Sequence, residues 1–163
     1  MMGELIATAD GGYAFTGWAL SGDGDLSGHH EPDYTSDVWV VKLDADGTLS
    51  WQKNLGGSGA DQAECIIQTS DGGYAVAGHT QSSDGDVVGQ HGNWDIWVVK
   101  LDPMGISPGR SALAAPVENL PMVSPRHLMA ALSLPERRIP LTVMLAAIMV
   151  RWPAAIRTGT CGS

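Results

Sequence analysis

The sequence predicts an all-β chain built from two tandem units of four antiparallel strands. Two observations predict it: a long internal repeat, and short runs of β-branched and aromatic residues between Gly- and Asp-rich turns. We place unit one at residues 3–61 and unit two at residues 62–105, where the pattern of a fourth strand is missing. Residues 106–163 have a different composition and form a Pro-, Arg- and Ala-rich tail.

The internal repeat makes the two units equivalent position by position. Two of the matched pairs are 61 positions apart and the third pair is 58 apart, because unit one has three extra residues before its third strand. Identity at this level indicates a duplication. The matched pairs are DGGYAFTG (10–17) with DGGYAVAG (71–78), SGDGDLSGHH (21–30) with SSDGDVVGQH (82–91), and DVWVVKLD (37–44) with DIWVVKLD (95–102).

Each unit is expected to form its strands in chain order. The first two make a hairpin, because the D-G-G between them supplies residues that accept positive φ. In the third strand Trp39, Val41 and Leu43 share one face, since side chains alternate along a strand. The expected strands of unit one are ELIAT (4–8), GYAFTGWA (12–19), VWVVKLD (38–44) and TLSWQKNL (48–55).

Four short strands in each unit, with Gly and Asp at the corners, are typical of a β-propeller blade, and a β-sandwich of hairpins is the alternative. A propeller closes with about four to eight blades. Two units therefore predict an incomplete propeller with open faces. Either several chains associate through these open blade edges, or the tail covers them, or the chain is a fragment.

The motifs also resemble a known type of repeat. DGGYxxxG, SxDGDxxGxH, DxWVVKLDxxG and WQKxLGGSG are similar to the propeller-type repeats of secreted and cell-surface bacterial proteins, over residues 3–105 only. The resemblance implies a non-enzymatic binding or structural module, located outside the cell or on its surface, with a carbohydrate or protein ligand. The alternative is a propeller fragment of a hydrolase or carbohydrate-active enzyme whose catalytic residues lie elsewhere.

Charge and hydropathy exclude two classes of partner. Residues 1–105 hold 16 of the 18 acidic residues, and so much negative charge disfavours nucleic acid, whose phosphates dominate binding. The most apolar stretch, at 139–150, is shorter than the roughly 20 residues of a bilayer span. The first residues show no signal-peptide pattern.

The repeated loop S-x-D-G-D-x-x-G-x-H is the candidate binding site. Carboxylates two positions apart in a Gly-rich loop can point at one cation, and oxygen ligands suit Ca²⁺. The alternative is that these carboxylates only form turns with nearby backbone amides. The candidate metal ligands are Asp23 and Asp25 in unit one and Asp84 and Asp86 in unit two, with His30 and His91 at the ends of the two loops.

Two aromatic residues in the segment before the third strand form a second candidate. Exposed aromatic rings at Tyr34 and Trp94 could stack on sugar rings, whereas ordinary packing is the alternative. No catalytic motif is found, since Ala60 occupies the last Gly position of the G-x-S-x-G pattern.

The tail has two interpretations. A shifted reading frame explains why Asp, Tyr and Lys disappear soon after Gly105 while Arg, Pro and Met become frequent. A fused segment with short helices is the alternative, because Ser124 and Pro125 suit a helix N-terminus and an apolar run follows Pro140.

Overall fold

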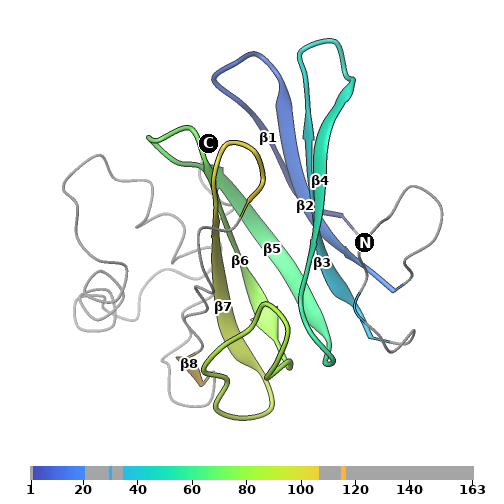
Figure 1. Ribbon diagram of the computed structural model, residues 1–163, viewed down its shortest axis with the longest axis vertical. Helices are drawn as coiled ribbons and strands as arrows, with labels where there is room; N and C mark the ends of the chain where they lie inside the picture. Colours follow the sequence, from blue (N-terminus) through green and yellow to red (C-terminus); the bar gives the residue numbers. More distant parts are fainter. Residues whose placement is uncertain (1, 21–29, 31–34, 107–114, 117–163) are drawn as a thin grey trace, which may run out of the picture.

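The structure, a computed structural model, describes residues 2–20, 30, 35–106 and 115–116. These residues form two antiparallel sheets, with no helix among them (Figure 1). The prediction of an all-β chain is therefore confirmed. The described part of the chain also contains no helix that is long and apolar enough to cross a membrane. Apart from residues 106, 115 and 116, the tail lies outside the described residues, and so do its expected helices.

Each sheet follows the chain order of one unit. Sheet 1 has the order β1-β2-β3-β4, and sheet 2 has the order β5-β6-β7-β8. β8 consists of two residues that pair with the start of β7, in the place of the fourth strand for which unit two has no sequence pattern. The strands are β1 (Met2–Ala7), β2 (Tyr13–Ala19), β3 (Asp37–Leu43), β4 (Leu49–Leu55), β5 (Asp61–Gln68), β6 (Tyr74–Thr80), β7 (Asp95–Leu101) and β8 (Ala115–Pro116).

The same side-chain contacts hold the D-G-G turn in both units. In unit one the Asp10 carboxylate accepts hydrogen bonds from the Thr8 hydroxyl and from the Gly12 N–H, and it pairs with Lys42 Nζ at 2.9 Å. In unit two the Thr69 hydroxyl and then Lys100 lower the pKa of Asp71 to about 2. The recurrence of T-x-D-G-G and of Lys in the third strand follows from these contacts.

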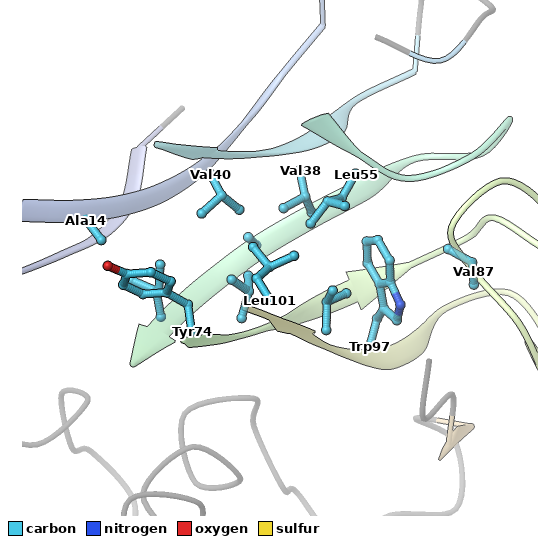
Figure 2. Packing of buried hydrophobic residues seen from close by; sticks show 12 residues of the cluster. Ala14, Val38, Val40, Leu55, Tyr74, Val87, Trp97 and Leu101 are labelled. Carbon is cyan, nitrogen blue, oxygen red and sulfur yellow. The ribbon is translucent and has the colours of Figure 1, made fainter. Parts of the chain in front are cut away.

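The two sheets share one hydrophobic core, and β5 packs against β1, β2 and β3 (Figures 1 and 2). The core consists of aliphatic and aromatic side chains, and each fully buried side chain of this kind contributes about 1.5–3 kcal/mol. Sheet 1 contributes Ala14, Val38, Val40 and Leu55, with Ile6 and Trp51 partly buried beside them, and sheet 2 contributes Ala63, Ile66, Tyr74, Val76, Trp97, Val99 and Leu101.

Equivalent strands of the two units use opposite faces in this core. In β3 the core residues are Val38 and Val40, whereas in β7 they are Trp97, Val99 and Leu101, which correspond to Trp39, Val41 and Leu43 in β3. A two-fold pairing of equal units would bring equivalent faces together. The units are therefore stacked head to tail, with one face of unit one against the opposite face of unit two.

The other side of sheet 1 is an apolar surface, which we call the outer face. The cross-strand register places its residues in rows on one side of β1, β2 and β3, because side chains alternate between the two faces. Phe15 and Trp39 pack edge to face there, with ring centroids 5.6 Å apart. The outer face consists of Leu5 and Tyr13, which are exposed, Phe15, Trp39 and Leu43, which are half-buried, and Val41, which is buried.

Candidate functional site

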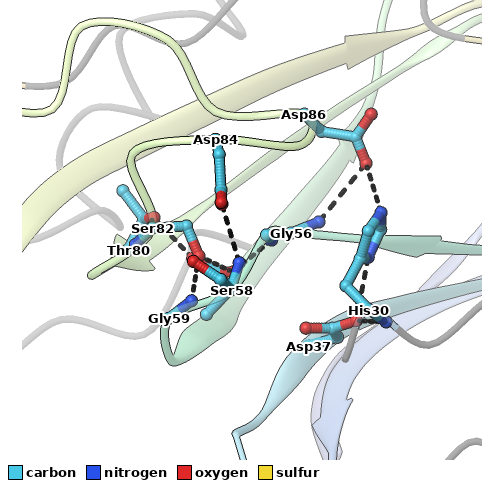
Figure 3. A network of polar contacts seen from close by, with 11 residues as sticks. His30, Asp37, Gly56, Ser58, Gly59, Thr80, Ser82, Asp84 and Asp86 are labelled. Carbon is cyan, nitrogen blue, oxygen red and sulfur yellow. Dashed lines mark hydrogen bonds and ion pairs between the residues drawn. The ribbon is translucent and has the colours of Figure 1, made fainter. Parts of the chain in front are cut away.

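The repeated D-G-D loop of unit two lies against the segment that connects the two sheets (Figure 3). Asp84 and Asp86 belong to the loop between β6 and β7, and Gly56, Gly57 and Ser58 belong to the connection between β4 and β5. These residues are 26 to 30 positions apart in the chain. We call this arrangement the inter-repeat loop contact.

Both aspartates of the D-G-D loop accept hydrogen bonds from backbone amides of the connection. Asp84 Oδ1 accepts from the Ser58 N–H at 2.7 Å, and this bond lowers the pKa of Asp84. Asp86 Oδ2 accepts from the Gly56 N–H at 3.3 Å, while the Asp86 N–H donates to the Gly56 carbonyl at 2.8 Å. The loop thus fixes the connection through main-chain groups, which explains why the connection contains small residues.

His30 links unit one to the same loop. Its backbone N–H donates to Asp37 Oδ2 at 2.6 Å, and its ring Nδ1 lies 3.0 Å from the same oxygen. Its Nε2 lies 3.8 Å from Asp86 Oδ2 of unit two. The equivalent His91 donates its backbone N–H to Asp95 at 2.6 Å, and its side chain is exposed. The repeated His and the following Asp therefore bond to each other within each unit.

Asp61, at the start of β5, lies buried beneath the inter-repeat loop contact. It accepts hydrogen bonds from the Thr80 hydroxyl, from the Ser82 hydroxyl at 2.7 Å, and from the Gly57 N–H at 2.9 Å. Burial raises the pKa of Asp61, and the nearby carboxylate of Asp37 adds to this rise. Ser82 Oγ also accepts from the Gly59 N–H at 2.9 Å, so the cluster joins sheet 2 to the connection.

Two glycines of the loop, Gly85 and Gly89, allow a test of how closely the loop approaches the connection. Gly85 has φ +63°, and a Cβ there would collide with the Gly56 carbonyl, whereas Gly89 has φ +84° and open space around it. Alanine is strained at both positions, by about 1–2 kcal/mol. We expect Gly85→Ala to lower the free energy of unfolding by clearly more than Gly89→Ala, measured by urea unfolding. Equal losses would show that the loop does not touch the connection.

The predicted metal ligands of unit two lie among the described residues. Asp84 and Asp86 bond to the connection, His91 bonds to Asp95, and no three His, Cys, Asp or Glu side chains of the described residues are grouped to hold a metal ion. Asp23 and Asp25 lie outside the described residues, and the Ca²⁺ sites of both units stay predictions.

Of the two aromatic candidates, only Trp94 lies among the described residues. Trp94 is half-buried and packs edge to face on the His79 ring, with centroids 6.4 Å apart. His79 in turn lies 3.2 Å from Glu64. Trp94 therefore has a packing partner in sheet 2, and Tyr34 lies outside the described residues.

Sequence reasoning missed the buried acids of the site. Asp37 and Asp95 occupy equivalent positions at the start of the third strand, and each is fully buried. Their recurrence after His30 and His91 was a usable signal, because only a paired aspartate is tolerated inside a strand. Asp61 had no such signal, since its partners Thr80 and Ser82 come from a distant loop.

Comparison with known proteins adds no functional assignment. No protein-family model matches the chain, and no curated protein matches it significantly.

Proposed function

We propose that the chain is a non-enzymatic structural module, made of two consecutive blade-like units of a β-propeller from a secreted or cell-surface bacterial protein. The observation that carries the proposal is the head-to-tail stacking of sheets 1 and 2 through opposite faces. Neighbouring blades around a ring must meet in this sense, because each blade then offers its free face to the next one. A two-sheet sandwich of equal units has no such requirement.

The polar groups of the repeated loop support a structural role over catalysis or metal binding. Asp84 and Asp86 each accept a main-chain N–H of the connection, and Asp61 accepts three hydrogen bonds. A side chain whose acceptor oxygens are used in this way holds the two units together. The repetition of the loop in both units fits the same role, since every unit needs a contact to its neighbour.

Calcium dependence tests this proposal. We expect Asp84→Asn to lower the melting temperature by the same amount in EDTA and in millimolar Ca²⁺, because the lost group is the acceptor of the Ser58 N–H. Asp46→Asn is the matched control, since Asp46 is an exposed turn aspartate in unit one. Chromogenic ester and glycoside substrates should not be turned over by the purified chain.

Two results would contradict the proposal. One is a Ca²⁺-dependent rise in the melting temperature that Asp84→Asn abolishes, since a ligand at a hundredfold excess over Kd stabilises by about 2.7 kcal/mol. The other is substrate turnover that copurifies with the chain.

A further inference from the structure

Two pairs of equivalent residues lie in opposite environments, whereas Val41 and its equivalent Val99 are both buried. Tyr74 is 1% exposed while its equivalent Tyr13 is 42% exposed, and Ile66 is 0% exposed while Leu5 is 54% exposed. The sequence thus presents one apolar surface twice. In unit two this surface is buried in the core, and in unit one it is the outer face of sheet 1.

The copy of this surface in unit two is already covered, so its contacts show which kind of surface packs against it. In unit two it packs against Ala14, Val38 and Val40 of unit one, which are small or β-branched residues (Figure 2). At the edge of the sheets the Trp51 ring packs on the Tyr74 ring, with centroids 5.5 Å apart. Glu4 Oε2 of unit one accepts the Ile66 N–H at 3.0 Å. The complementary surface is therefore the inner side of a unit of the same type.

We propose that the outer face of sheet 1 is a docking surface for a further β-repeat of the same type, positioned before unit one. The docked repeat presents its equivalents of Ala14, Val38 and Val40 to this face, and its equivalent of Trp51 packs on Tyr13. The outer face continues an interface that already exists between units one and two. The proposal rests on the proposed function only in taking the chain as part of a longer array of repeats.

A second copy of this chain is not the occupant. The inner side of unit one is already buried against unit two. The corresponding side of unit two is also buried, since Ala77, Ile96 and Val98 are at most 4% exposed. An identical chain thus has no free copy of the complementary surface, whereas an additional repeat does.

The experiment adds one repeat to the full chain. A copy of residues 3–61 is joined directly to Met1, which keeps the natural spacing of 61 positions between equivalent residues. Tyr13→Ala is then made in the original unit one, both in this three-unit chain and in the natural chain. We expect the variant to lower the melting temperature of the three-unit chain by about 5 °C or more and that of the natural chain by much less. In the three-unit chain with Val40→Lys in the added copy, Tyr13→Ala should again have little effect.

Three outcomes overturn the proposal. The first is an equal effect of Tyr13→Ala in the natural and three-unit chains. The second is an added repeat that gives no additional β-sheet signal in circular dichroism, because a docking surface of this kind should order it. The third is dimerisation of the natural chain that Tyr13→Lys abolishes, which would make a second copy the occupant. Failure of the proposed function would show in the calcium and turnover measurements and not in these.

Discussion

Replacing Tyr74 by alanine is expected to lower the free energy of unfolding by about 3 to 5 kcal/mol, as for other large aromatic residues removed from a core. Tyr74 is 1% exposed and packs on the Trp51 ring of the other unit. The truncation therefore creates a cavity between the two sheets. Urea unfolding followed by tryptophan fluorescence measures the loss.

Tyr13→Ala is the matched control, because it removes the same side chain at the equivalent position of unit one. Tyr13 is 42% exposed on the outer face, so we expect a loss of less than about 1 kcal/mol. Similar losses at the two positions would mean that equivalent faces of the units have the same environment. Head-to-tail stacking would then be wrong.

Replacing Asp61 by alanine is the second substitution with a large expected effect, a loss of about 3 kcal/mol near pH 4. It removes the acceptor of the Thr80 hydroxyl, the Ser82 hydroxyl and the Gly57 N–H. A buried donor that is left without an acceptor costs about 1–3 kcal/mol. Urea unfolding of the variant and the wild-type chain at several pH values measures the difference.

The pH dependence of this loss has a defined sign. Burial raises the pKa of Asp61 in the folded state above its ordinary value of 3.8. Its contribution to stability is therefore complete below pH 3.8 and decreases as the pH rises through the folded-state pKa. The loss caused by Asp61→Ala should shrink as the pH rises above 3.8.

Asp71→Ala is the control of opposite sign. The Thr69 hydroxyl and Lys100 lower the pKa of Asp71 to about 2. Its contribution is present above pH 3.8 and is lost as the pH falls toward 2, so its removal should matter less in acid. A loss at Asp61 that grows with rising pH would show that its carboxylate is stabilised in the charged form.

The strands could be predicted from the sequence because each signal was local. Alternating residues in VWVVKLD and the D-G-G turns predicted β1 to β3 and β5 to β7 within a few residues, and TLSWQKNL predicted β4. The division of side chains between two faces followed from alternation alone. Alternation cannot say which face meets the other unit, because both faces of β3 are apolar.

The inter-repeat loop contact could be predicted only in part. The repeated D-G-D loop was identified as important, but its partners are backbone amides of the connection at 56–58, and an amide has no sequence signature. The calcium site predicted from the same carboxylates stays a prediction. Asp61 was missed because an aspartate is ordinarily expected at the surface of a protein. The three donors that hold Asp61 in the interior cannot be recognised in the sequence.

Nuclear Overhauser effects between aromatic rings test the head-to-tail stacking most directly. Trp51 lies on the core side of sheet 1 and packs on Tyr74 of unit two, with ring centroids 5.5 Å apart, while Tyr13 lies on the outer face of sheet 1. Ring protons of Trp51 should therefore show cross-peaks to Tyr74 and none to Tyr13. Cross-peaks from Trp51 to the Ile96 and Val98 side chains, with none to Tyr74, would place equivalent faces together and contradict the stacking.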